Sequence, residues 1–420
     1  MSEDSQFSED DPRVLSVIGN LRGYKLCDHC LGRLVGKIGH GYTNDLRGRI
    51  LRDAKVLPEL PEGETCWLCE GLFERTDEMA AAVLSRLEQL EWNKFSIGSR
   101  YDPSIIEREE IVWAECGAQH AEPIKSEVNR EVGKRVEALS GKEVDLVNPD
   151  VRAIIDVDFL AIDVEISPLF IYGRYRKLDR SIPQTKWPCR KCRGKGCERC
   201  GFTGKMYPES VEELVAREFI SAAEAEGSSF HGMGREDIDA QMLGSGRPFV
   251  LELKSPRKRT LDLVLLGEAT NRANSGRVEI SDLRMSSKEE VRSIKGSRAQ
   301  KSYMVSVELD EEKARAKLIE VIRLLTQSPI EQRTPNRVNH RRADKVRLQR
   351  VYGAELEGLE GRRATIRVRA AAGTYIKELM HGDDGRTHPS LSELLETGVR
   401  VLQLDVMEIH DGSDSDGEGI

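Results

Sequence analysis

Residues 231–253 read HGMGREDIDAQMLGSGRPFVLEL, a stretch that joins a polar, glycine-rich loop to an apolar segment. The loop carries Arg235 and two carboxylates, Asp237 and Asp239, within five residues. The aromatic and aliphatic residues of 249–254 predict a strand that lies in a core. The two aspartates by themselves fit turn residues or helix caps as well as a catalytic site, so other parts of the chain must decide.

Two further segments offer side chains of related chemistry. Residues 300–309, QKSYMVSVEL, place Tyr303 at the start of a predicted strand, and residues 373–391, GTYIKELMHGDDGRTHPSL, contain Tyr375 and Lys377. The chain has no P-loop Gly-Lys-Ser/Thr and no strand–GxGxxG–helix pattern, so nucleotide, dinucleotide and methyl-donor sites are not indicated. The candidate chemistry is that of a carboxylate, tyrosines and a basic side chain.

The 420 residues predict several α+β domains, because a domain has on the order of 150 residues. We expect an acidic tail (1–12), a zinc-binding module (13–70), an α/β RNA-binding unit (71–187), a cysteine knuckle (188–206), a long mixed or antiparallel-sheet domain (207–406) and a second acidic tail (407–420). Periodicity predicts helices over 14–34, 71–90, 123–139, 211–225 and 310–327, the last with Asp310 as its N-cap. Strands are predicted over 151–157, 159–166, 169–177, 249–254, 261–266, 278–282, 304–309, 364–370 and 400–406, with a glycine-rich loop over 231–247.

The net charge of −8 hides strongly basic segments. Residues 1–12 hold five acids and residues 405–420 hold six, with no Lys or Arg in either. Residues 171–206 hold eleven bases against two acids, and residues 331–350 hold seven against two. Since local fields guide a polyanion, these segments indicate nucleic acid, although solvated faces of an acidic protein would also explain charge runs.

Eight of the nine cysteines form four CxxC pairs, a spacing typical of zinc ligands. One quartet is predicted to comprise Cys27, Cys30, Cys66 and Cys69, and the other Cys189, Cys192, Cys197 and Cys200. Four thiolates leave no open position on the metal, so we expect structural Zn²⁺ at the first quartet. The second quartet is expected either to bind a second metal or to stay partly reduced and empty. An iron–sulfur cluster remains an alternative for the second quartet, and disulfides fit a cytosolic chain poorly.

No apolar run approaches the ~18 residues that a membrane span needs, and the acidic N-terminus is unlike a signal peptide. We therefore expect a cytoplasmic protein without a membrane partner.

The segments GREDIDAQMLGSGRPF (234–249), QRTPNRVNHRRADKVR (332–347) and GTYIKELMHGDDGRTHPSL resemble the archaeal Pus-ten family of tRNA pseudouridine synthases. The resemblance covers nearly the whole chain. The N-terminal part resembles that family's zinc-bearing THUMP region, which ends in the FIYGRYRK signature (170–177), and residues 207–406 resemble its catalytic domain.

The resemblance implies roles for single residues. Gly234-Arg235-Glu236-Asp237 matches the Gly-Arg-x-Asp loop that carries the catalytic aspartate, with Asp239 as the rival. QKSYMV resembles the Lys-x-Tyr strand of the TruB family, so Tyr303 would stack on the base. Gly-Thr-Tyr-Ile-Lys resembles the TruB strand whose Arg pairs with the catalytic Asp, so Lys377 would pair with Asp237 and Tyr375 would line the pocket.

The resemblance also implies a substrate. It predicts isomerisation of uridines 54 and 55 in the T-arm of tRNA by a monomer, with no cofactor for catalysis, while the THUMP region holds the acceptor end. Phosphate contacts are expected from Lys and Arg side chains of the two basic segments, namely Arg174, Arg176, Arg333, Arg337, Arg341, Arg342, Lys345 and Arg347. The alternatives are a zinc and THUMP tRNA-binding adaptor without activity, or a THUMP-linked methylase or thiolase, whose glycine loop we do not find.

Overall fold

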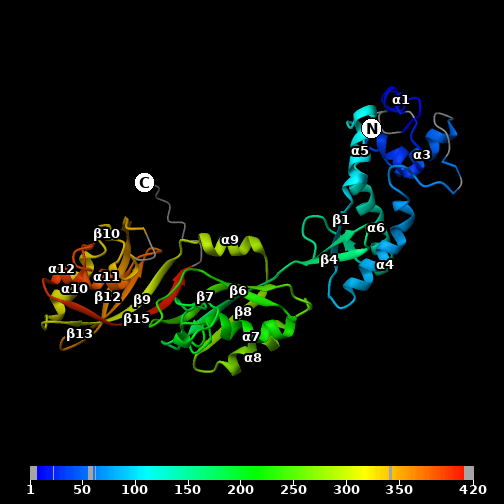
Figure 1. Ribbon diagram of the computed structural model, residues 1–420. Helices are drawn as coiled ribbons and strands as arrows, with labels where there is room; N and C mark the ends of the chain where they lie inside the picture. The colour runs from blue at the N-terminus through cyan, green and yellow to red at the C-terminus, as the bar shows by residue number, and fades with distance from the viewer. Residues whose placement is uncertain (1–6, 22, 55–59, 62, 340–342, 411–420) are drawn as a thin grey trace. The chain divides into compact units, whose positions relative to one another are not determined.

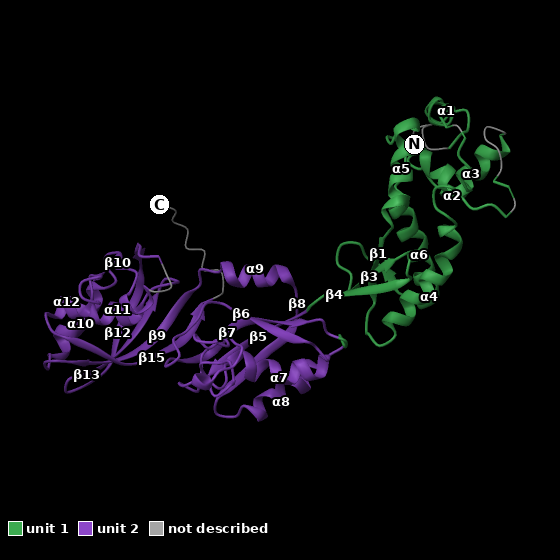
Figure 2. Ribbon diagram, in the orientation of Figure 1, with its two compact units in different colours: residues 1–168, 257–259 green, residues 169–256, 260–420 purple. Residues whose placement is uncertain are grey.

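The computed structural model describes residues 7–21, 23–54, 60–61, 63–339 and 343–410. The chain divides into two compact units (Figure 2), of which the first ends at Pro168 and includes residues 257–259, while the second begins at Leu169. Both units combine helices with a sheet (Figure 1), so the predicted α+β class is confirmed. Within the described ranges, no helix is long and apolar enough to span a bilayer.

The first unit contains a four-stranded sheet of order β2-β1-β3-β4, in which β1 is parallel to both its neighbours and β4 is antiparallel to β3. Helix α6 packs on the sheet because Val128, Val132 and Val136 recur at helical spacing and are fully buried. The elements are α1 (Pro12–Gly19), α2 (Asp28–Gly32), α3 (Asn44–Asp53), α4 (Thr76–Leu87), β1 (Lys94–Arg100), α5 (Pro103–Cys116), α6 (Ile124–Ser140), β2 (Glu143–Val144), β3 (Val151–Asp156) and β4 (Ala161–Ile166).

The second unit contains an eight-stranded sheet of order β12-β13-β9-β15-β7-β5-β8, with β6 also paired to β7. The neighbours are antiparallel except β15 and β7, whose short parallel pairing joins the two halves of the sheet. These strands are β5 (Leu169–Lys177), β6 (Gly227–Gly232), β7 (Gln241–Lys254), β8 (Val278–Ser286), β9 (Gln300–Leu309), β12 (Val351–Glu360), β13 (Arg363–Ala370) and β15 (Val399–His410).

A small three-stranded sheet and six helices complete this unit. The small sheet has the order β11-β10-β14, from β10 (Ile330–Arg333), β11 (Val346–Gln349) and β14 (Thr387–His388). The helices are α7 (Val211–Ala223), α8 (Leu263–Ala273), α9 (Lys288–Gly296), α10 (Arg315–Leu324), α11 (Ile376–His381) and α12 (Leu391–Leu395). Short 3-10 turns occur at Glu198–Cys200 and Asn336–Val338 in this unit, and at Arg33–Val35 and Leu72–Arg75 in the first unit.

The predicted domain boundary at 187 is wrong. The strand 169–177 exists as predicted, but as β5 it pairs with β7 and β8 in the sheet of the second unit. Its alternating side chains bury Leu169, Ile171 and Tyr175 in that unit's core, and this burial decides where the strand belongs.

Several predicted elements also differ. Residues 261–266 do not form a strand, because the Asp262 side chain accepts hydrogen bonds from two backbone N–H groups and caps helix α8. Helix α10 begins at Arg315 and not after Asp310, whose backbone N–H continues pairing with Gly398 beyond β9. The predicted helix 14–34 is split into α1 and α2, and most of loop 231–247 belongs to or adjoins β6 and β7.

The predicted tails are shorter than expected. Phe7 is buried in the first unit, and β15 continues to His410, so residues 7–12 and 407–410 do not behave as free tails. The outer parts of both tails, residues 1–6 and 411–420, lie outside the described residues.

Candidate active site

The loop of residues 233–240 lies where the two halves of the large sheet meet. It connects β6 to β7, and the first two residues of β7 pair with β15 at that junction. The buried Lys177 holds the loop, because its Nζ donates hydrogen bonds to the carbonyl oxygens of Asp237 (3.2 Å) and Ile238 (2.7 Å). Gly234 adopts a positive φ of 78°, a conformation that favours glycine, and so allows the chain to turn before Asp237.

Two cations hold the carboxylate of Asp237. Nη1 of Arg337 lies 3.0 Å from Oδ1, and Nζ of Lys377 lies 3.5 Å from Oδ2. Burial disfavours the charge of Asp237, but Arg337 and Lys377 outweigh it and lower the pKa of this carboxyl below its ordinary value of 3.8. Asp237 is therefore ionised at neutral pH.

Both cations also contact a second acid. Nε of Arg337 lies 2.6 Å from the buried Glu378, and Nζ of Lys377 lies 2.8 Å from Asp239. The side chain of Asp239 is 70% exposed, against 29% for Asp237. The two predicted carboxylates therefore differ in their surroundings, with Asp237 the more enclosed.

A buried polar network fixes the chain on the other side of Asp237. Nε of Arg247 lies 2.9 Å from Glu236, and the Tyr175 hydroxyl lies 2.9 Å from the same carboxylate. Nε2 of Gln184 donates hydrogen bonds to the Tyr175 hydroxyl (2.8 Å) and to the carbonyl oxygen of Gly234 (3.0 Å). These partners offset the cost of burying the charges and fix the loop to β5 and β7.

Asp237 opens onto a cavity of about 570 Å³, which Tyr303, Tyr375 and Lys301 also line. That volume lies in the usual range for small-molecule sites. Burial raises the pKa of Tyr303 to about 12, so its hydroxyl stays protonated at neutral pH. Burial and the nearby Arg247 lower the pKa of Lys301 to about 8.

An aromatic pair forms part of the cavity wall. The rings of Trp187 and Tyr207 meet edge to face with 5.6 Å between their centroids, and both line the cavity. The guanidinium carbon of the exposed Arg235 lies 4.8 Å from the centroid of the Trp187 ring. All five predicted substrate-site residues, Asp237, Tyr303, Tyr375, Lys377 and Arg235, therefore line one cavity.

Arg337 differs from its prediction, which placed it against phosphates. The structure places it in the cavity, against Asp237, with its guanidinium 6.0 Å from the ring centroid of Tyr375. It lies 100 residues from Asp237 in the sequence, so no local pattern indicated the contact.

The other predicted phosphate contacts lie away from Asp237 or outside the described residues. Arg174 donates to the backbone carbonyl oxygens of Ser245 and Gly246, and Arg176 pairs with Glu279. In the segment 331–350, Arg333 pairs with Asp344, Arg347 donates to Thr334, and Lys345 is exposed, whereas Arg341 and Arg342 are not among the described residues. Their role toward RNA stays a prediction.

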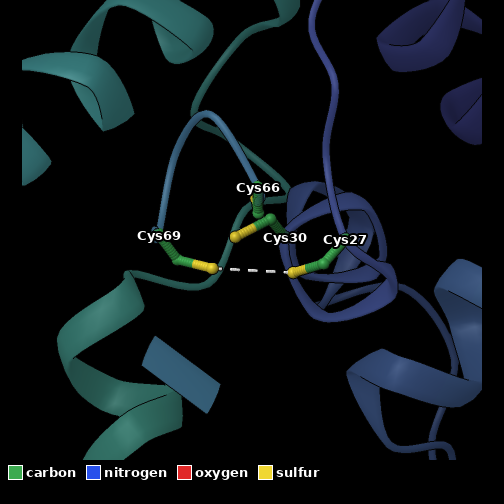
Figure 3. Close-up of side chains that lie close together, drawn as sticks. All are labelled: Cys27, Cys30, Cys66 and Cys69. Carbon is green, nitrogen blue, oxygen red and sulfur yellow. Dashed lines mark hydrogen bonds between the residues drawn. The ribbon is translucent and has the colours of Figure 1, made fainter. Parts of the chain in front are cut away.

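The cysteines assemble as the spacing predicted. In each quartet the four Sγ atoms lie within 4.8 Å of one another. Figure 3 shows Cys27 and Cys30 facing Cys66 and Cys69, with 3.6 Å between the sulfurs of Cys27 and Cys69. A Zn²⁺ tetrahedron with bonds of about 2.3 Å has edges of about 3.8 Å, so the quartet fits a zinc ion.

The second quartet has similar dimensions, with Sγ separations of 3.9 Å for Cys189–Cys197 and for Cys192–Cys200. These separations are far longer than a disulfide bond of about 2.05 Å. Both quartets could therefore hold a metal ion that four thiolates would enclose.

Sequence reasoning missed Glu236, Glu378 and Arg247, and it misread the FIYGRYRK segment. Glu236 and Glu378 directly precede and follow predicted site residues, so their position was a usable signal. In β5 the alternation of side chains would have placed Tyr175 and Lys177 on one face, away from Arg174 and Arg176. Arg247 gave no local signal.

Comparison with known families matches both units. Residues 170–410 match the family described as Pus10, C-terminal, and residues 79–156 match the Pus10 THUMP domain, archaeal. The first range lies in the second unit, apart from residues 257–259, and the second range lies in the first unit.

Similar proteins include the tRNA pseudouridine synthases Pus10 of Methanothrix thermoacetophila and Methanopyrus kandleri. The first is 45% identical, with 94% of each chain covered, and the second is 42% identical, with 93% of this chain and 97% of the relative covered. Among solved structures, a Cbf5-Nop10-Gar1 complex aligns with 56% of this chain and 48% of its own at a TM-score of 0.32 and 19% identity.

Proposed function

The chain belongs to the Pus10 (Pus-ten) family of tRNA pseudouridine synthases, and on that premise we propose that it isomerises uridines 54 and 55 in the T-arm of tRNA, with Asp237 as the essential carboxylate. The reaction breaks the N1–C1′ bond of uridine, rotates the uracil and joins C5 to C1′, while the proton on C5 is lost and N1 gains one. The overall change is an isomerisation, so it has no net oxidant or reductant.

The observation that carries the proposal is the environment of Asp237. Its carboxylate faces a cavity of nucleoside size and is kept ionised by Arg337 and Lys377. An ionised carboxylate is required whether it attacks C1′ or removes the proton from C2′. Asp239 satisfies this less well, because its side chain is mostly exposed.

The neighbouring residues suit an extruded uridine. The ring of Tyr303 would stack on the uracil, while its protonated hydroxyl can donate a hydrogen bond. Tyr375 would line the cavity, and Lys377 and Arg337 would orient the carboxylate. Extrusion costs a few kcal/mol, which stacking and hydrogen bonds in the cavity offset.

The remaining parts of the proposal concern binding. The THUMP region would hold the acceptor end while the cavity reaches the T-arm, so recognition depends on shape as well as on bases. Lys and Arg side chains of residues 331–350 would contact phosphates of the RNA. Both cysteine quartets would hold structural Zn²⁺, since the thiolate set and the sulfur separations fit that ion.

The decisive test compares Asp237→Asn with Asp239→Asn on one unmodified tRNA transcript, without added cofactor. Asp237→Asn keeps the size of the side chain and removes its charge. We expect the rate of pseudouridine formation to fall by more than the ~10²-fold typical of losing general acid–base help, with tRNA affinity retained. Carbodiimide treatment and primer extension would map the products at positions 54 and 55.

Asp239→Asn should be much milder, because Lys377 and Arg337 still hold Asp237. An active Asp237→Asn beside an inactive Asp239→Asn would move the catalytic role to Asp239. A wild-type protein that binds tRNA tightly but forms no pseudouridine would instead support the adaptor without activity.

A further inference from the structure

The second cysteine quartet lies directly next to the aromatic wall of the cavity in the sequence. Trp187 precedes the quartet by two residues and Tyr207 follows it by seven. Pro188 and Lys205 form an antiparallel bridge, and the backbone N–H of Met206 donates to the carbonyl oxygen of Trp187 (2.9 Å). The knuckle 188–206 is therefore a closed hairpin whose base presents Trp187 and Tyr207 to the cavity.

The knuckle has almost no core of its own. Between residues 188 and 206 the only buried apolar side chain is Cys189, while the other three cysteines of the quartet are half-buried. Gly204 packs against backbone so closely that an added Cβ would lie 2.3 Å from the carbonyl oxygen of Gly194. A segment that buries so little apolar surface depends on a cross-link, which four thiolates around one metal would supply.

The surface of the knuckle suits RNA. It holds six bases, which are Arg190, Lys191, Arg193, Lys195, Arg199 and Lys205, against the single acid Glu198. Within the knuckle, Phe202 is 74% exposed. An exposed aromatic ring among basic side chains is typical of proteins that stack on unpaired bases while contacting phosphates.

Arg235, which lines the cavity, contacts one of the two aromatic rings where the hairpin begins and ends. The guanidinium of Arg235 lies over the ring of Trp187, and Tyr207 meets the edge of the same ring. Arg235 is two residues from Asp237. A loss of order in the hairpin would therefore displace Trp187, the ring that the Arg235 guanidinium contacts.

We propose that the knuckle 188–206 is a metal-organised RNA-contacting element. The cysteine quartet holds Trp187 and Tyr207 in place. Trp187 and Arg235 then bind an unpaired RNA base next to the uridine that reacts. Phe202 stacks on a further RNA base. The four cysteines are positioning residues, because they act through Trp187, Tyr207 and Phe202. The inference rests on the proposed function in one respect, which is the identity of the RNA as the T-arm loop.

The test is a double-mutant cycle on affinity for a fluorescent T-arm stem–loop RNA, measured with full-length protein carrying Asp237→Asn so that the RNA stays unreacted. Trp187→Ala and Cys197→Ser should each weaken binding by about 5-fold to 100-fold, the range expected for losing base stacking. Because the quartet acts through Trp187, the two losses of affinity should not add. The double variant should bind RNA nearly as well as whichever single variant binds it more weakly. Trp187→Phe, which keeps a ring, should restore most of the affinity.

Controls separate a local effect from misfolding. Cys116→Ser replaces the cysteine outside both quartets and should leave affinity unchanged. Metal analysis should show one ion fewer per chain in Cys197→Ser, and thermal unfolding of the second unit should stay near wild type. Phe202→Ala, whose side chain is exposed and cannot disturb a core, should also weaken binding by about 5-fold or more.

The proposal is overturned if Cys197→Ser removes no metal, if Phe202→Ala binds as tightly as its parent, or if Trp187→Ala and Cys197→Ser act additively. Failure of the proposed function would give a different result. The wild-type protein would then form no pseudouridine, while Trp187→Ala and Cys197→Ser would still act non-additively on RNA affinity.

Discussion

Arg337 holds two carboxylates with one guanidinium, and this makes it the residue on which the charge of Asp237 most depends. Its Nη1 contacts Asp237 and its Nε contacts Glu378, which is almost fully buried. The contact with Glu378 thus fixes the orientation of the Arg337 guanidinium, and its Nη1 remains available to Asp237. The planar fork suits this double contact, which a lysine could not reproduce.

Replacing Arg337 by Met should slow the reaction and change its pH dependence. Asp237 loses its largest stabilising charge, so its pKa rises. The active form is the carboxylate, which is lost as pH falls through the pKa, so the rate of the variant should drop on acidification at pH values where the wild type is still constant. We expect the loss of rate to grow as the pH falls, approaching about 10-fold for each pH unit below the raised pKa of Asp237, because the ionised fraction falls by that factor.

Single-turnover rates between pH 5 and pH 8 would measure this. The matched control is Arg333→Met, because Arg333 lies in the same basic segment but pairs with the exposed Asp344. If Arg337→Met lowered the rate equally at every pH, Arg337 would act on RNA binding or positioning and not on the ionisation of Asp237.

At the scale of elements, β5 determines how the Asp237 loop is held. The strand alternates, so Tyr175 and Lys177 point into the core beneath the loop while Arg174 and Arg176 point away. Lys177 is fully buried, and its Nζ donates to three carbonyl oxygens, those of Ile182, Asp237 and Ile238. Burial lowers the pKa of Lys177, and the carboxylates around it only partly oppose that effect.

Lys177→Met should destabilise the protein by roughly 1–3 kcal/mol, because buried carbonyl oxygens lose their donor. It should also slow pseudouridine formation, since two of those carbonyls flank the Asp237 side chain. Urea unfolding and single-turnover rates would measure the two effects. Arg176→Met is the control on the opposite face, where its half-exposed pair with Glu279 contributes less than about 1 kcal/mol. Equal losses in the two variants would contradict this role for Lys177.

At the scale of the whole molecule, the buried apolar side chains of the described residues form two large clusters and a small third one of Val250, Val291 and Ile294. One large cluster of buried side chains includes Cys30, Cys66 and Cys69 of the first quartet, and the other contains β5 and the strands around the cavity. Among the residues that the structure describes, no buried apolar side chain belongs to both large clusters. The two units can therefore lose stability independently.

Cys66→Ser should remove one metal ion and lower the unfolding temperature of the first unit alone, because metal binding by thiolates is linked to folding. Scanning calorimetry should show one transition moved downward and the transition of the second unit unchanged. Activity on a T-arm stem–loop should persist, since Asp237 lies in the second unit. A downward shift of both transitions, or a zinc content equal to wild type, would contradict the prediction.

Local sequence patterns determined several features of this protein. The CxxC spacing identified both quartets, because the two cysteines of each pair lie three residues apart and need only a turn to share a metal. Helical spacing identified residues 123–139, and a run of residues that favour strands identified 169–177, because both signals arise within a few turns or residues of backbone. The loop motif placed Asp237, Arg235 and the rival Asp239 in one segment.

The tertiary structure alone decided which of these groups act together. Arg337 reaches Asp237 across 100 residues from the 3-10 turn Asn336–Val338, which lies outside the large sheet. Lys177 reaches the Asp237 loop across 60 residues because β5 and β7 are neighbours in that sheet. The same sheet assigned β5 to the second unit, although its basic residues had suggested an RNA-binding end of the first. Strand order and side-chain burial depend on contacts between distant segments, and a pattern that spans a few residues does not contain that information.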